Sequence, residues 1–251
     1  RANPPAQPRL VVFNREIGEG CRLETIEVES APGVFLPACL FLPEKEPASV
    51  SDRRPLLILA EPGGRTSQWR EGSLCPRLAA AGFSVCALDV RGVGDLRPEV
   101  GRGNQGYALS HAREEAYAWA SSILGKPLLG QRVEDLAAAA RALKSYAGGG
   151  RRLVLAARGS LAVPALCAAA LAPEIDAVYL AGGLISWSSL LEVDDYREPF
   201  ANFLPGVLKK TDLPFIARSV LPRRVIVAGA VDATGRTVDR ETAARLYGAH
   251  V

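Results

Sequence analysis

The chain has 251 residues, of which 48% are hydrophobic and 23% charged, with a formal net charge of +3. This length and composition favour one globular domain with a sizeable core and exclude a disordered or fibrous chain. No apolar run reaches the roughly 18–20 residues that a bilayer span needs, so no membrane partner is predicted. The basic residues are dispersed in pairs without interleaved aromatic residues, which argues against a nucleic-acid partner.

The first residues, 1–19, are predicted to form an N-terminal extension, followed by a single domain over residues 20–251. The start of the chain has no initiator methionine and no signal-peptide pattern. Such a start is also what cleavage of a leader would leave, so a secreted or periplasmic location stays open. The cysteines show no C-x-x-C pair and no metal-ligand spacing, so neither a metal site nor a cofactor is predicted.

The domain is predicted to begin with two β-rich runs, residues 23–28 and 34–42, which form a hairpin. Residues 55–60 are continuously apolar, as expected for a strand that is covered on both faces. This strand leads into Gly63 and Gly64. The pair forms either a simple turn or a loop whose bare N–H groups face a ligand.

Strand and helix patterns then alternate, with a helix predicted over residues 73–81 and a strand over 83–89. This alternation predicts an α/β fold with a parallel sheet. Residues 101–106 match G-x-G-x-x-G, but no strand precedes them and no helix begins at the last glycine, which excludes a dinucleotide site. Helices are predicted over 111–124 and 130–146, and His111 is interpreted as a surface residue.

Residues 151–166 predict a strand, a tight turn and an alanine-rich helix. A serine nucleophile in a G-x-S-x-G motif lies at such a turn, because only small residues fit beside its strained backbone. The five positions here read Ala157-Arg-Gly-Ser-Leu161. If the end of the apolar run sets the register, the nucleophile position holds Gly159, which has no side chain. If Ser160 is the nucleophile, the bulky Arg158 occupies one flank, so neither register gives the intact motif.

The last part of the chain contains predicted strands over residues 175–181 and 223–229, joined by a long connection. The second of these strands delivers Asp232 at its carboxyl end. Asp239 is then predicted to cap a short helix that ends at Tyr247. The chain closes with Ala249-His250-Val251.

The order of these elements resembles the α/β-hydrolase superfamily. The resemblance rests on Gly63-Gly64, the run Asp89-Val-Arg-Gly-Val-Gly94, the elbow and Ala230-Val-Asp232. The segments Glu115–Trp119, Leu124–Leu128 and Arg132–Asp135 are similar to those of bacterial acetyl xylan esterases and related carbohydrate esterases. The resemblance implies a mostly parallel sheet with helices on both faces, which lacks the last strand of the family.

For the site, the resemblance implies an elbow at residues 157–161, an acid at Asp232 and an oxyanion donor near Gly64, beside Gly63. The family's base follows its acid, and His250 is the one histidine after Asp232. The family places a strand before this histidine, and here His250 comes directly after a predicted helix.

Two functions follow from these observations. The first is an esterase-like domain with a degenerate serine-hydrolase site, which binds an ester or carbohydrate ligand, or a neighbouring domain of a larger chain, with little or no hydrolysis. The second is an active carboxylic ester hydrolase that uses Ser160, Asp232 and His250, or one that a missing C-terminal segment completes. Glycine at the elbow and the position of the histidine favour the first.

Overall fold

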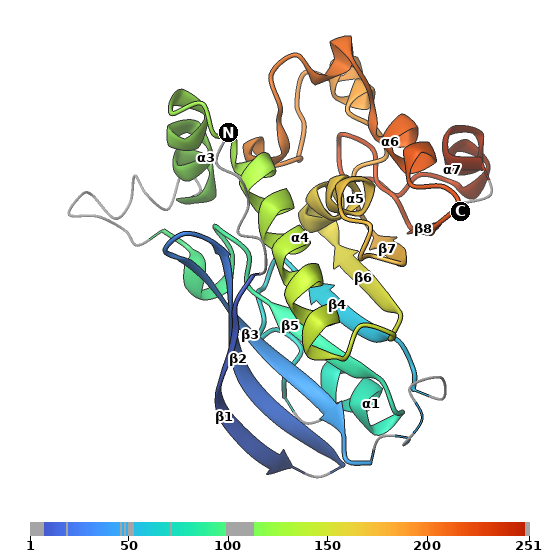
Figure 1. Cartoon of the computed structure of the whole chain (residues 1–251). Coiled ribbons are helices and arrows are strands. Elements are labelled where there is room, and N and C mark those ends of the chain that lie inside the picture. Colours follow the sequence, from blue (N-terminus) through green and yellow to red (C-terminus); the bar gives the residue numbers. More distant parts are fainter. Residues whose placement is uncertain are drawn as a thin grey trace.

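The computed structural model describes residues 8–18, 20–45, 47, 49, 53–70, 72–98 and 113–248. In these residues one sheet of eight strands runs in the order β1-β2-β3-β5-β4-β6-β7-β8 (Figure 1). The strands are β1 (Leu10–Gly18), β2 (Cys21–Ala31), β3 (Val34–Pro43), β4 (Leu56–Ala60), β5 (Ser84–Leu88), β6 (Leu153–Arg158), β7 (Ala177–Ala181) and β8 (Arg224–Ala228). The helices are α1 (Leu74–Ala80), α3 (Arg113–Ile123), α4 (Leu128–Tyr146), α5 (Ala162–Leu171), α6 (Leu213–Ser219) and α7 (Arg240–Tyr247).

The sheet is mixed but mostly parallel, which confirms the predicted fold class. Strands β5, β4, β6, β7 and β8 run parallel to one another, whereas β1, β2 and β3 form an antiparallel extension, in which β3 pairs antiparallel with β5. Within the described residues β8 is the edge strand, so no further strand follows it there.

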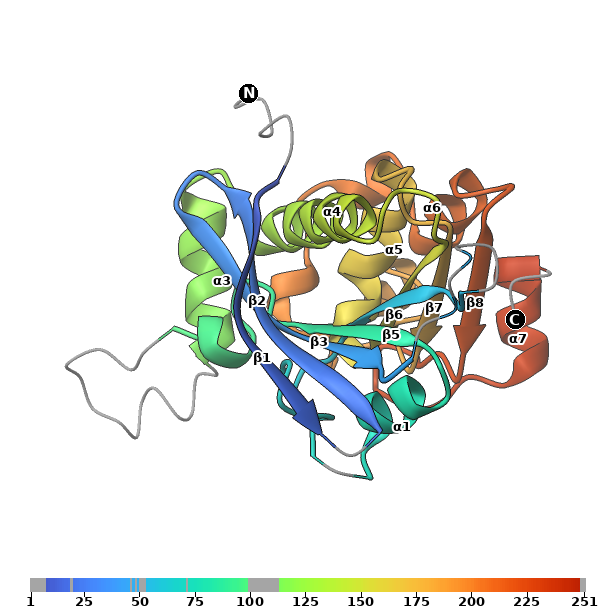
Figure 2. The same ribbon diagram turned by 60° about the horizontal axis from the view of Figure 1, so that its bottom comes forward.

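Helices cover both faces of the sheet, as predicted, and Figure 2 shows α4 and α5 on the face opposite α1. The alternation along β3 explains how one strand serves two cores. Ala38 and Leu40 belong to the large core under α4 and α5, whereas Cys39 and Phe41 belong to a smaller core under α1.

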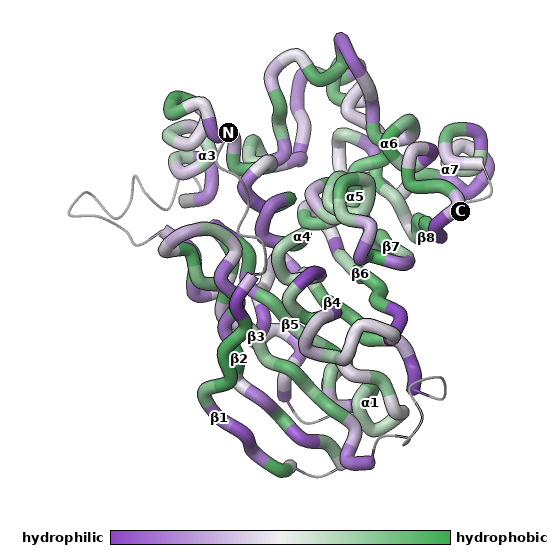
Figure 3. The backbone as a smooth tube through the Cα atoms, in the orientation of Figure 1, coloured by the Kyte–Doolittle hydropathy of each residue, from purple (hydrophilic) through white to green (hydrophobic). Residues whose placement is uncertain are grey.

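The structure differs from the sequence analysis at residues 10–18, which were predicted to belong to an N-terminal extension. They form β1, which pairs antiparallel with β2 from Leu10↔Val28 to Gly18↔Cys21. Most of the β1 side chains are exposed, and Figure 3 shows both hydrophobic and hydrophilic stretches along the strand. Its apolar run, residues 10–13, is short and only partly buried and ends at Asn14, so it lacks the longer buried run that identifies an inner strand.

Helix α4 is the longest helix, and apolar residues such as Leu136, Ala140 and Leu143 form its buried face. None of the helices in the described part of the chain has the length and apolar character that crossing a bilayer requires. The glycine-rich residues 101–106 and His111 lie outside the described residues.

Candidate functional site

The predicted elbow is present at the carboxyl end of β6. The strand ends at Arg158, and a single 3-10 turn, η3 (Gly159–Leu161), leads into α5. Gly159 has φ +52°, a left-handed backbone that favours glycine. The strained position of the turn is therefore occupied by Gly159, and Ser160 is the residue after it.

Ser160 is half-buried, and its hydroxyl forms no hydrogen bond with another described residue. The space beside the elbow faces the loop after β4: a Cβ added to Gly159 would meet Pro62 Cγ at 3.4 Å. The elbow thus retains room for a small side chain at the glycine position, and the serine hydroxyl is available one residue later.

The elbow is covered by a segment that the sequence analysis left as an unassigned connection. Asn202, in the short helix η5 (Phe200–Asn202), is buried and donates from Nδ2 to the Ser160 carbonyl at 2.6 Å and to Glu198 Oε1 at 2.5 Å. The Asn202 carbonyl accepts from Trp187 Nε1 at 3.1 Å. No local spacing signals this contact, because its partners are 42 residues apart.

Burial raises the pKa of the Glu198 carboxyl from its ordinary 4.5 to about 7. The Asn202 hydrogen bond lowers the pKa in part, and the nearby Glu114 carboxylate raises it again. A carboxyl group that titrates near neutral pH is therefore linked to the elbow through the side chain of Asn202.

The Glu198→Gln variant is expected to lose a pH dependence of stability. The folded chain holds the Glu198 proton up to a pKa of about 7 and the unfolded chain only up to 4.5, so wild-type stability falls as pH rises between these values. The glutamine amide does not titrate. The unfolding free energy of the wild type, measured relative to that of the variant, should therefore fall by roughly 3 kcal/mol between pH 4.5 and pH 7. Urea denaturation at several pH values measures this, with the exposed Glu241→Gln as control, and parallel wild-type and Glu198→Gln profiles would contradict it.

The two predicted oxyanion glycines lie in a tight turn after β4. The Gly64 N–H donates to the Glu61 carbonyl at 2.9 Å, so this donor is engaged within the turn. A Cβ on Gly64 would lie 2.7 Å from Asp89 Oδ1, and a Cβ on Gly63 would lie 2.8 Å from Ser67 Cβ. Both positions require glycine for packing, and an oxyanion role for either remains a prediction.

The buried Glu61 carboxylate links this loop to the elbow. It accepts from Ser67 Oγ at 2.8 Å, from Gln68 Nε2 at 3.3 Å and from Arg158 Nη1 at 3.3 Å. The Arg158 side chain is exposed and reaches toward the loop after β4. The bulky residue beside the elbow thus has a defined partner.

A second set of polar contacts, around Asp89, joins the loops after β4 and β5. The buried Asp89 carboxylate accepts from the Arg65 backbone N–H and Nη1, both at 2.6 Å, and from the Asp95 N–H at 3.0 Å. Arg65 also pairs with Asp95 at 2.7 Å. Asp89 and Gly94, two residues that carried the family resemblance, therefore position the loop that contains Gly64.

Asp232 lies after the carboxyl end of β8, as predicted. Its Oδ1 accepts from the Thr234 N–H, the Thr234 hydroxyl and the Arg236 N–H at 2.7–3.0 Å. These bonds, that from the Thr234 hydroxyl first, lower the pKa of the Asp232 carboxyl. No described residue donates to Oδ2, so this oxygen is free to accept from another group.

The elbow and the Asp232 loop are connected through the segment after β7. The Val231 N–H donates to the Gly183 carbonyl at 2.9 Å, and a Cβ on Gly183 would collide with Ala162 Cβ at the start of α5. The structure therefore brings Ser160 and Asp232 to the same edge of the sheet. His250, the predicted base, lies outside the described residues, and so its role stays a prediction.

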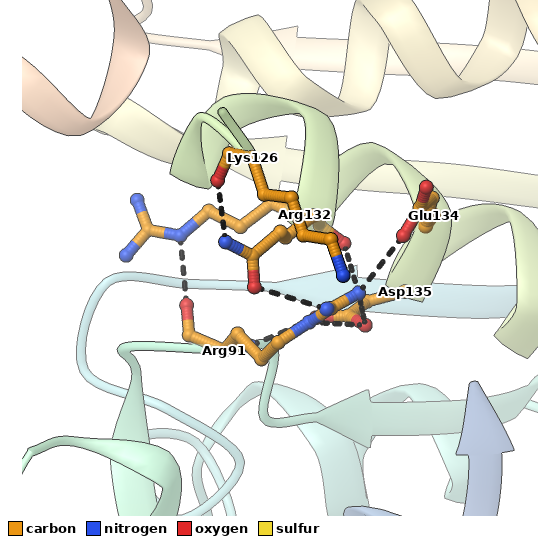
Figure 4. A network of polar contacts seen from close by, with 6 residues as sticks. Arg91, Lys126, Arg132, Glu134 and Asp135 are labelled. Carbon is orange, nitrogen blue, oxygen red and sulfur yellow. Dashed lines mark hydrogen bonds and ion pairs between the residues drawn. The ribbon is translucent and has the colours of Figure 1, made fainter. Parts of the chain in front are cut away.

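Three further residues from segments of the family resemblance, Arg91, Arg132 and Asp135, form a buried network of ion pairs and hydrogen bonds (Figure 4). Arg91 donates from its N–H and its Nε to the Asp135 carboxylate at 2.9–3.0 Å, and its carbonyl accepts from Arg132 Nε at 2.9 Å. Arg132 is fully buried and pairs with Glu114 Oε1 at 2.7 Å. These bonds join α3 and α4 to the loop after β5. The network therefore fixes the positions of these elements, and it lies apart from the elbow.

The described residues contain no cluster of three histidine, cysteine, aspartate or glutamate side chains that could hold a metal ion. The five cysteines are free thiols, four of them buried. Burial raises the pKa of Cys75 and of Cys167 to about 12, so neither thiol is an activated nucleophile.

Comparison with known proteins identifies the class of this fold. No family model matches the chain, and no curated protein sequence does. A solved structure from Bacteroides fragilis NCTC 9343, assigned as an acetyl xylan esterase, matches with a TM-score of 0.71 and 18% identity over 97% of this chain and 67% of that one. Acetyl xylan esterase from Paenibacillus sp. R4 matches with a TM-score of 0.59 and 14% identity over 97% and 78%. Glucuronoyl esterase from Solibacter usitatus matches with 0.53 and 14% over 98% and 75%.

The chain therefore has the α/β-hydrolase fold. Its structural neighbours include acetyl xylan esterases and other carbohydrate esterases, which confirms the resemblance read from the sequence. Identities of 14–18% show a shared fold, and a fold hosts many activities, so the activity depends on the residues of the site.

Proposed function

We propose that this chain is an acetyl xylan esterase-like domain with a degenerate serine-hydrolase site, which binds its ligand with little or no hydrolysis. The observation that carries the proposal is Gly159, which takes the left-handed backbone at the elbow with φ +52°. The position from which a nucleophile would project has no side chain. Loss of one triad member typically lowers the rate by several orders of magnitude.

The proposed ligand is a small carbohydrate or its ester. The names of the structural neighbours support this class. Ligands of open α/β sheets bind at the carboxyl ends of the strands, where the elbow and Asp232 lie. A cavity of about 370 Å³ opens beside Asp232 and is lined by Asp195, Arg197, Thr234, Gly235 and Arg236. A neighbouring domain of a larger chain is the other partner that we propose for this edge.

The proposal predicts that a fluorophosphonate probe leaves the wild-type mass unchanged under conditions that label a control esterase fully. The reason is that neither Gly159 nor an unactivated Ser160 can form the phosphonyl adduct. Intact-mass spectrometry with peptide mapping measures the outcome, with Ser160→Ala as the matched control. An adduct on Ser160 that is absent from Ser160→Ala would contradict the proposal.

The second candidate function is hydrolysis of a carboxylic ester through Ser160, Asp232 and His250. Two observations favour it: the Ser160 hydroxyl has no partner among the described residues, and Asp232 Oδ2 is free to accept from a base. The same labelling experiment decides between the candidates, because a working triad makes its serine reactive toward the probe.

A further inference from the structure

Four aromatic side chains form a row of ring contacts at the segment that covers the elbow. Trp119 of α3 stacks on Phe200 with ring centroids 4.2 Å apart and an interplanar angle of 16°. Phe200 stacks on Phe203 at 5.6 Å and 22°, and Phe203 contacts Tyr196 at 5.3 Å. Only the rings at the two ends of such a row have a face that no other ring of the row covers.

Trp119 stacks on Phe200, and 52% of its surface is nevertheless exposed. One of its ring faces is covered by Phe200, so the outer face accounts for its exposure. The row lies outside the two main cores, and Phe200 packs against the separate small cluster of Ala118, Leu128 and Ala201. A large apolar ring fixed in water contributes little to folding and is typical of a binding surface.

The row adjoins the site through η5. Phe200 and Asn202 belong to this one short helix, and Asn202 donates to the Ser160 carbonyl. The segment that supports Trp119 is therefore the segment that covers the elbow. A ligand on Trp119 would extend toward the carboxyl edge of the sheet.

The chemistry around the ring restricts the ligand. Trp119 Nε1 lies 3.4 Å from Glu115 Oε1, so a carboxylate that can accept from hydroxyl groups borders the ring. An apolar face with an acidic acceptor at its rim suits a neutral pyranose, which has a C–H face and hydroxyl donors, and disfavours an anionic ring.

We propose that the outer face of Trp119 is a stacking platform for a neutral pyranose unit of a carbohydrate ligand, an inference that rests on the carbohydrate class in the proposed function. The competing occupant is a second copy of this chain. Ile123 lies one helical turn further along α3 and is 81% exposed, so it would extend an apolar contact surface. The flat, braced ring and its acidic rim favour the sugar, and the experiment below separates the two.

Affinity electrophoresis through gels that contain hydroxyethyl cellulose, arabinoxylan or galactomannan tests the platform. The wild type should be retarded by at least one of these neutral polysaccharides, and Trp119→Ala should weaken that retardation about tenfold, as for an aromatic hot spot. Trp69→Ala is the matched control, because Trp69 is 46% exposed and belongs to no ring stack of the described residues. Trp119→Leu, which keeps an apolar contact with Phe200, replaces Trp119→Ala if that variant does not fold.

No retardation of the wild type in any of the three gels would overturn the proposal, as would equal retardation of wild type and both Trp119 variants. Sedimentation velocity of the same proteins tests whether the surface instead binds a second copy of the chain. A loss of self-association in Trp119→Ala and Ile123→Ser, without an effect on retardation, would assign the surface to a second copy instead. Because the gels detect carbohydrate binding and the fluorophosphonate probe detects an activated serine, failure of the platform and failure of the degenerate-site proposal are distinguishable.

Discussion

The Gly94→Ala variant is expected to lose roughly 4 kcal/mol or more of unfolding free energy, or not to fold. Gly94 has φ +57°, and a Cβ there would overlap the carboxylate of Asp89. That carboxylate is buried and holds the N–H groups of Arg65 and Asp95, so it cannot move without breaking these bonds. Urea denaturation of the purified variant measures the loss.

The control for this prediction is Gly125→Ala. Gly125 also has a left-handed backbone, with φ +70°, but nothing lies within 4 Å of an added Cβ. The control therefore isolates the backbone strain, which costs about 1–2 kcal/mol. If the two variants lost equal stability, the contact with Asp89 would not explain the effect.

Removal of the Asp212 carboxylate is expected to cost roughly 3–5 kcal/mol of unfolding free energy. Asp212 is buried and accepts from three backbone N–H groups, those of Trp187, Ser188 and Leu213, at 2.7–3.1 Å. In Asp212→Ala these three donors, of which those of Trp187 and Leu213 are buried, lose their acceptor. Trp187 in turn holds the Asn202 carbonyl, so the cover of the elbow should loosen as well.

Asp239→Ala provides the comparison, because Asp239 also caps a helix but is exposed. Its carboxylate accepts from the Thr242 N–H at 2.8 Å, and loss of such a cap costs about 1 kcal/mol. Thermal denaturation of both variants tests the difference. A loss for Asp212→Ala no larger than that for Asp239→Ala would show that the three bonds to the Asp212 carboxylate do not stabilise the fold as predicted.

The inner part of the fold could be predicted because its strands are buried on both faces. Continuous apolar runs identify β4, β5 and β6, and the break of the last run at Gly159 locates the elbow. The position of Asp232 after β8 follows from the same reasoning. Strand β1 has only a short, partly buried apolar run at residues 10–13, because it lies at the edge, and its place in the sheet becomes visible only when β2 is present to pair with it.

The polar groups around the elbow could not be predicted, because each binds a partner that is distant in the sequence. Asp212 reaches back 25 residues to Trp187, and Asn202 reaches back 42 residues to Ser160. Neither residue has neighbours that form a motif. By contrast, the glycines of the resemblance are local requirements of tight turns, and these are what a sequence pattern records.

The sheet order also determines when the site can form. Strand β4 pairs on one side with β5, which follows closely, and on the other side with β6, where Leu56 meets Leu153. About a hundred residues separate these partners, and contacts of such separation form slowly. During synthesis the second edge of β4 stays unpaired until β6 has emerged, and it is then a template for pairing with other chains. Because β6 also carries the elbow, the centre of the sheet and the candidate site assemble in the same late step.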